Sequence, residues 1–237
     1  TGKTTMARAL LNRLGESVDT ALLFNPILST WELLSAINDD FGQTVSSPSH
    51  KDQLEALNRF LLARFQEGRN ALVVIDEAQN LSIEALEMIR LLSNLETPTE
   101  KLLQILLIGQ PELDEKLARY ELRQLNQRII LRSRLKPIGP EDISSYVLFR
   151  LGCAGANVDK ISFEAAAFRR IYQSSNGLPR LINTLCDRVL ICAFVEETRV
   201  ITESIVRSAE RDLTPEERSE KPGWKRFRRL SFFSLRG

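Results

Sequence analysis

The first half of the chain alternates short runs of aliphatic residues with segments of helical periodicity. The clearest run, Ala71 to Asp76, contains four consecutive aliphatic residues, three of them β-branched, which is typical of a strand buried on both faces of a parallel sheet. A second buried strand is expected over Leu102 to Gln110, and a short one over Thr20 to Asn25, which Pro26 ends. Ile129 to Leu135 alternates in the manner of an edge strand with one solvated face.

Between these runs, apolar residues recur every three or four positions, which predicts helices. Asp52 and Ser82 are expected to cap two of these helices at their N-termini, and Gly42 and Gly68 to end two of them. The expected helices span Met6 to Leu14, Thr30 to Phe41, Asp52 to Gly68, Ser82 to Leu95, Pro111 to Leu117 and Glu121 to Gln127. Strands that alternate with helices predict an α/β fold, with a parallel sheet covered by helices on both faces.

The pattern changes at about Pro140, after which every expected element is helical. These helices span Glu141 to Leu151, Ser162 to Ser174, Leu178 to Glu196 and Thr202 to Leu213, and no strand pattern appears among them. We therefore expect an α/β domain over residues 1–138, a small all-helical lid domain over residues 139–213, and a charged linker with a basic tail over residues 214–237.

Composition limits the possible chemistry. With 43% hydrophobic residues, 27% charged residues and a net charge of +1, the chain has the character of a soluble globular protein without a general attraction to nucleic acid or membrane. Its one histidine, His50, is expected in a loop, which argues against histidine catalysis and zinc binding. The chain contains three cysteines, Cys153, Cys186 and Cys192. Because they are odd in number and lack metal-ligand spacing, we interpret them as small apolar residues of a protein in a reducing compartment.

Two acids, Asp76 and Glu77, follow the central strand directly. The carboxyl ends of parallel strands are where open α/β sheets bind ligands. A carboxylate there can hold Mg²⁺, which prefers oxygen ligands, and its neighbour can orient and polarise a water molecule. The alternative is a buried strand followed by a solvated acidic turn.

The chain opens with Gly2-Lys3-Thr4-Thr5 at the start of a predicted helix, which is the second half of a P-loop, G-x-x-x-x-G-K-[ST]. In such a loop Gly2 lets the backbone approach a phosphate, Lys3 reaches the β- and γ-phosphates, and the Thr4 hydroxyl binds Mg²⁺. The first glycine of the motif and the strand before it would precede Thr1, so we expect the sequence to begin inside its phosphate loop. Joined to the Asp76-Glu77 strand, the motif predicts a P-loop nucleoside triphosphatase.

Four further residues are candidates for contact with a nucleotide. Gln110 ends the second buried strand and could hold an attacking water near Glu77, or it could cap the helix that Pro111 begins. Arg123 and Arg128 precede the edge strand and could serve as an arginine finger or be solvated. Arg180 lies in the first turn of a long helix, where a cation opposes the helix dipole and a bound phosphate would offset that cost.

The order of these features resembles that of AAA+ ATPases, over about Thr1 to Leu213. The resemblance implies a phosphate loop at Gly2, Lys3, Thr4 and Thr5, with Mg²⁺ bound at Thr4 and Asp76. It further implies that Glu77 is the catalytic base, Gln110 sensor 1, Arg128 or Arg123 the arginine finger, and Arg180 sensor 2. A glutamine at the sensor 1 position departs from the asparagine or threonine of many members.

Three sequence motifs more closely resemble those of one branch of this family, the ExeA/GspA-type ATPases of general (type II) secretion. This resemblance rests on Val74 to Gln79 (VIDEAQ), Leu107 to Leu113 (LIGQPEL) and Gly177 to Asn183 (GLPRLIN). It implies a cytoplasmic ATPase that uses ATP and Mg²⁺, followed by one inner-membrane helix and a periplasmic peptidoglycan-binding part. Such a protein would work as a homo-oligomer and with a partner protein in assembling a secretion machine. Related ATPases of pilus biogenesis, exopolysaccharide export and DNA transposition share many of these motifs. Among these alternatives, only DNA transposition would make nucleic acid a partner.

The tail combines basic and aromatic residues. Lys225, Arg226, Arg228 and Arg229 follow Trp224 and precede the apolar Leu230 to Leu235. This pattern is that of the cytoplasmic flank of a membrane helix. A disordered basic tail and a tail that binds nucleic acid are the alternatives.

Overall fold

The computed structural model describes residues 2–15, 17–24, 26–45, 49–156, 160–213 and 231–235, and for residues 3, 4 and 231–235 it describes the backbone alone. The chain divides into two compact units, each with an apolar core of its own. The first unit contains residues 3–135 together with 231–235, and the second contains residues 136–213.

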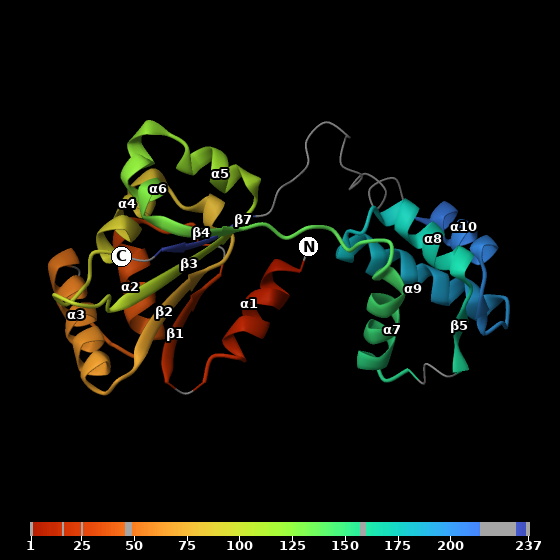
Figure 1. The fold of residues 1–237 in the computed structure, drawn as a ribbon, viewed down its shortest axis with the longest axis horizontal. Helices are drawn as coiled ribbons and strands as arrows, with labels where there is room; N and C mark the ends of the chain where they lie inside the picture. The colour runs from red at the N-terminus through yellow and green to blue at the C-terminus, as the bar shows by residue number, and fades with distance from the viewer. Residues whose placement is uncertain are drawn as a thin grey trace. The chain divides into compact units, whose positions relative to one another are not determined.

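A five-stranded sheet forms the centre of the first unit, in the order β1-β2-β3-β7-β4 (Figure 1). Its strands are β1 (Val18–Leu23), β2 (Asn70–Ile75), β3 (Leu103–Gly109), β4 (Ile129–Ser133) and β7 (Ser231–Leu235). Strands β1, β2 and β3 are parallel, with Val73 of β2 opposite Ala21 of β1 and Ile105 of β3. The buried aliphatic run therefore forms a central strand, and its carboxyl end lies between the ends of β1 and β3.

Helices cover both faces of this sheet, and the side chains of β2 show the division. Val73 and Ile75 belong to a large apolar cluster, whereas Leu72 and Val74 pack with Ala7 of α1 in a second, smaller cluster. The helical elements are α1 (Lys3–Leu11), α2 (Thr30–Asp40), α3 (His50–Gln66), η1 (Ala78–Asn80), α4 (Ile83–Leu92), α5 (Pro111–Leu117), η2 (Tyr120–Leu122) and α6 (Arg123–Arg128). The predicted α/β fold with helices on both faces is confirmed.

The capping predictions had mixed outcomes. The Ser82 side chain accepts a hydrogen bond from the Ala85 N–H at 3.1 Å, as expected of an N-cap. The prediction that Asp52 begins α3 was wrong, because Ser49 stands at the N-cap position and His50 is the first helical residue. His50 therefore does not lie in a loop; its ring lies 3.0 Å from the Thr30 hydroxyl, a contact that sequence periodicity could not reveal.

Part of the segment that the sequence pattern interprets as a membrane flank forms strand β7, and the membrane interpretation stays a prediction. Residues 231–235 pair antiparallel with β3 on one side and with β4 on the other. Pairing on both sides satisfies backbone N–H and C=O groups that β3 and β4 would otherwise leave open. No helix in the described residues is long and apolar enough to cross a membrane. The other tail residues, 214–230 and 236–237, lie outside the described part. Strand β7 lies between β3 and β4 in the sheet.

Within the described residues, the second unit contains the α-helices α7 (Ile143–Cys153), α8 (Ala165–Ser175), α9 (Pro179–Val195) and α10 (Glu203–Asp212). They enclose a separate apolar core that includes Val147, Ile171, Leu185 and Val206. The expectation of an entirely helical region was wrong in one detail, since β5 (Ser162–Phe163) and β6 (Val200–Ile201) form a short parallel ladder. Two-residue strands are too short to produce a readable period in the sequence.

We predict that Gly177→Ala destabilises the second unit by about 3 kcal/mol, because a side chain there meets both strain and a clash. Gly177 has φ +71°, and a Cβ would lie 2.0 Å from the carbonyl oxygen of Ile138. That backbone contact cannot relax freely, since the Ile138 N–H also donates to the Gly177 carbonyl at 2.8 Å. Chemical denaturation measures the effect. Gly152→Ala is the control, since its Cβ would meet nothing within 4 Å, and a similar stability for the two variants would contradict the prediction.

Candidate functional site

The acid pair lies at the carboxyl end of β2. Asp76 is only 2% exposed, its N–H donates to the Leu23 carbonyl at 2.9 Å, and its Oδ1 accepts a hydrogen bond from the Glu77 N–H at 2.9 Å. Glu77 has φ +54° and ψ +38°, a left-handed conformation that is uncommon for residues other than glycine. Strained backbone of this kind persists where the surroundings enforce it, and it is concentrated at active sites and ligand clamps.

Gln110 brings the end of β3 to this acid pair. It occupies the N-cap position of α5, but its side chain makes no capping hydrogen bond. Instead, its Nε2 donates to Glu77 Oε2 at 3.0 Å. Of the two alternatives that the sequence left open, the backbone of Gln110 takes the place of the helix cap, and its side chain contacts the acid.

Gln79 is a third member of the cluster, and it was missed in the sequence. Its Nε2 donates to Glu77 Oε2 at 2.5 Å, and its Oε1 accepts the Gln110 N–H at 3.0 Å. The only signal in the sequence was a polar residue two positions after Glu77. The 3-10 helix that carries Gln79 is too short to produce a repeating hydrophobic pattern.

Lys116 of α5 holds the turn that carries Gln79. Its Nζ donates to the main-chain carbonyls of Gln79 at 2.6 Å and Leu81 at 2.7 Å. Burial, and then the nearby charge of Arg119, lower the pKa of Lys116. An ammonium that replaces water contacts with two carbonyl oxygens fixes the loop after Glu77 against α5.

The two candidate finger residues have different surroundings. Arg123 is exposed, and its guanidinium lies over the Tyr120 ring, 4.0 Å from the centroid, and donates to the Tyr120 carbonyl at 3.3 Å. Arg128 is half-buried and donates to the Ser93 hydroxyl at 3.3 Å. The contact with Ser93 places Arg128 against the α4–β3 loop, and Lys101 first, then Arg128 to a smaller extent, lowers the pKa of Glu96 in that loop.

The remaining predicted residues belong to α1 and α9 or directly precede α1. Gly2 has φ +86° and directly precedes α1, which begins at Lys3, and Thr5 is exposed on that helix. The side chains of Lys3 and Thr4 lie outside the described part. Arg180 is exposed in the first turn of α9 in the second unit. No group of three or more histidine, cysteine or acidic side chains in the described residues could hold a metal ion.

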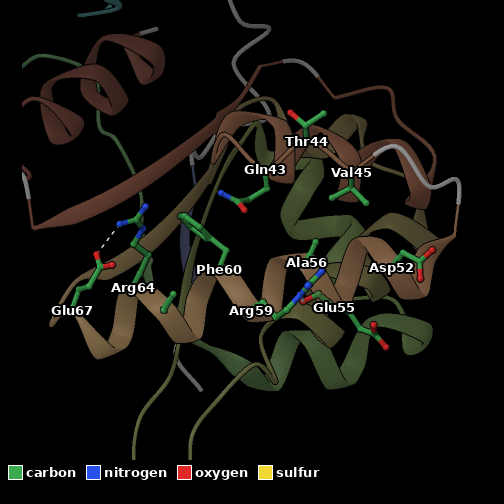
Figure 2. A pocket seen from close by; sticks show the side chains of 11 residues that line it. Gln43, Thr44, Val45, Asp52, Glu55, Ala56, Arg59, Phe60, Arg64 and Glu67 are labelled. Atoms are coloured by element: carbon green, nitrogen blue, oxygen red, sulfur yellow. Dashed lines mark hydrogen bonds and ion pairs between the residues drawn. The ribbon is translucent and has the colours of Figure 1, made fainter.

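A groove of about 720 Å³ lies elsewhere in the first unit, between α3 and the segment that follows α2 (Figure 2). Residues of both signs line it, among them Glu55, Arg59 and Arg64. Arg64 is already paired with Glu67 at 2.7 Å. The groove contains none of the predicted site residues, so the acid pair and not this groove is the candidate site.

Comparisons with known proteins concern the family and the fold of the chain. Residues 1–117 match the model of the AAA domain family. General secretion pathway protein A of Aeromonas hydrophila is 44% identical over 206 residues, which cover 85% of this chain and 37% of that protein. The chain thus spans well under half the length of this relative.

Two solved structures of the Aeropyrum pernix ORC2 protein have a similar fold. The ADP form has a TM-score of 0.61 at 19% identity, and the alignment covers 91% of this chain and 60% of the ORC2 chain. The structure of the ADPNP–ADP complexes also has a TM-score of 0.61, at 17% identity, and the alignment covers 93% of this chain and 61% of the ORC2 chain. The matched domain and the similarity to general secretion pathway protein A identify the chain as an AAA-domain protein of the ExeA/GspA type.

Proposed function

We propose that the protein binds ATP with Mg²⁺ and hydrolyses it to ADP and phosphate. The observation that carries this proposal is the contact between Glu77 and Gln110 beside the buried Asp76. Two strand ends thereby present a carboxylate and an amide at the edge of the sheet where parallel α/β folds bind ligands. The strained backbone of Glu77 supports an active-site role.

The residues present fit a bound Mg²⁺. Such an ion takes one or two protein oxygens and completes its octahedron with water and substrate phosphates. Asp76 supplies a carboxylate at the end of β2, and the Thr4 hydroxyl would be the second protein ligand. A single carboxylate suffices for a site of this type. When bound, the ion would neutralise charge on the phosphates.

The protein's own residues would perform the other steps. Gly2, Lys3, Thr4 and Thr5 would bind the phosphates at the N-terminus of α1, where free N–H groups favour an anion. Glu77 would accept a proton from the attacking water, and Gln110 would hold that water in place.

Charge stabilisation would come from two arginines. An arginine of the α6 region, Arg123 or Arg128, would reach a neighbouring subunit's nucleotide, and Arg180 would contact the phosphates from the lid formed by residues 139–213. This arrangement requires a homo-oligomer with the nucleotide at the subunit interface.

The similarity to general secretion pathway protein A supports a role in assembling a bacterial envelope secretion machine. In this proposal the chain is the cytoplasmic ATPase part of a protein anchored in the inner membrane, and it acts with a partner of the secretion apparatus. ATP binding would form the contact between neighbouring subunits and hydrolysis would release it. The energy of ATP would thereby be used for mechanical work on the secretion machine.

An assay of ATP hydrolysis by the full-length protein tests the proposal. We expect the specific activity to rise with protein concentration, because the finger comes from a neighbour, and to be lost when EDTA removes Mg²⁺. A preparation that binds ATP but shows no hydrolysis at any concentration would contradict the enzymatic proposal.

A further inference from the structure

Gln79 joins the two strand ends of the candidate site. Through one amide it donates to Glu77 Oε2 at 2.5 Å and accepts from the main-chain N–H of Gln110 at 3.0 Å. The Gln110 side chain donates to the same Glu77 oxygen at 3.0 Å. Three residues, located after β2, in η1 and directly after β3, thus form a closed loop of hydrogen bonds around one carboxylate oxygen.

The chemistry of this loop requires an amide at position 79. A main-chain N–H can only donate and a carboxylate can only accept, so the residue between them needs one acceptor and one donor. A glutamate would place a second acceptor against Glu77, and an asparagine is one methylene shorter. A neutral amide on a two-carbon stem therefore meets both partners.

The structure holds Gln79 in place by means that do not involve Glu77. Lys116 binds the Gln79 carbonyl at 2.6 Å and fixes the backbone of the turn. Gly109 leaves room on the other side, since a Cβ there would lie 3.2 Å from Gln79 Oε1 and 2.6 Å from Cδ2 of the buried Leu113. The main chain of Gln79 is thus held independently of Glu77, and its side chain has space beside Gly109.

We infer that Gln79 is a positioning residue, which aligns the Glu77 carboxylate for the attacking water and couples it to the main chain of Gln110. The inference rests on the proposed ATPase function. A carboxylate held by two converging donors loses rotational freedom, and such alignment contributes to rate without contributing to the binding of ATP. A movement of the β3 end would reach Glu77 through Gln79 as well as through the direct contact of the Gln110 side chain.

The test compares Gln79→Met and Gln79→Glu in the full-length protein, with kcat from steady-state hydrolysis and Kd from a fluorescent ATP analogue. Gln79→Met removes the donor and the acceptor and is expected to lower kcat roughly tenfold. Gln79→Glu is isosteric, keeps the acceptor for Gln110 and opposes Glu77 with a like charge, so kcat is expected to fall roughly 100-fold. In both variants Kd should stay within about twofold of the unmodified protein, a split that a purely structural role would not produce.

Gln66→Met, at the exposed end of α3, controls for the substitution itself. If Gln79→Met does not fold, the isosteric Gln79→Glu decides. Unchanged kcat in the folded Gln79 variants, or a loss that appears in Kd alone, overturns the inference. The series includes Glu77→Gln: if that variant also keeps its kcat, the proposed ATPase chemistry fails with the inference, and if it loses activity while the Gln79 variants do not, the inference alone fails.

Discussion

Replacing Glu77 with glutamine is expected to lower ATP hydrolysis by roughly 10² to 10⁴ while ATP binding is retained. The amide has the size of the carboxylate, and its oxygen can still accept the hydrogen bonds that Gln79 and Gln110 donate to Glu77. It cannot take a proton from water at neutral pH, so the loss falls on the chemical step. The site would remain assembled with its base removed.

Single-turnover hydrolysis with the protein in excess over ATP measures this effect, since it separates the chemical step from product release. Glu55→Gln provides a matched control on α3, where the same substitution affects an exposed residue outside the candidate site. A Glu77→Gln protein that hydrolyses ATP at the rate of this control would show that another group accepts the proton.

The sequence was most informative where a pattern reflects burial. The aliphatic run of β2 must be apolar on both faces because Val73 and Ile75 face one cluster and Leu72 and Val74 the other. A strand with that property lies inside a parallel sheet, which places Asp76 at the carboxyl edge. The location of the acid pair was therefore predictable from local sequence.

The contacts within the site depend on features that produce no hydrophobic periodicity in the sequence. Gln79 meets Gln110 across 31 residues of chain, and the turn that allows it relies on the left-handed Glu77. Strand β7 is another such case, because pairing with β3 and β4 depends on open strand edges rather than on its own composition. A run of apolar residues beside a basic stretch occurs both in membrane flanks and in paired strands, so composition alone does not distinguish them.

Removing the side chain of Arg123 is expected to lower kcat by roughly 10³ or more, the effect of losing an arginine finger. The structure favours Arg123 over Arg128 for this role. Arg123 is exposed and stacks on Tyr120, itself 75% exposed, so its guanidinium lies at the surface beside an aromatic ring. Tyrosine and arginine together are typical of the energetic centre of a protein interface.

Arg128 is the matched comparison, because its guanidinium is bound to Ser93, which is only 3% exposed. Arg128→Ala should therefore mainly lower the stability of the first unit, by about 1 kcal/mol for a lost hydrogen bond. Thermal unfolding and kcat measured on both variants separate the two roles. A loss of kcat in Arg128→Ala larger than that in Arg123→Ala would reverse the assignment.

Mixing inactive subunits shows whether the arginine acts on a neighbour. A Glu77→Gln subunit keeps Arg123 but lacks the base, and an Arg123→Ala subunit keeps the base but lacks the finger. In a head-to-tail assembly, an Arg123→Ala subunit beside a Glu77→Gln neighbour has one complete site, so an equal mixture should recover roughly a quarter of the unmodified rate. If Arg123 acted within its own subunit, no pairing would restore a complete site and the mixture would stay inactive. Recovery in the mixture, with neither variant active alone, requires that the nucleotide of one subunit be completed by the arginine of the next.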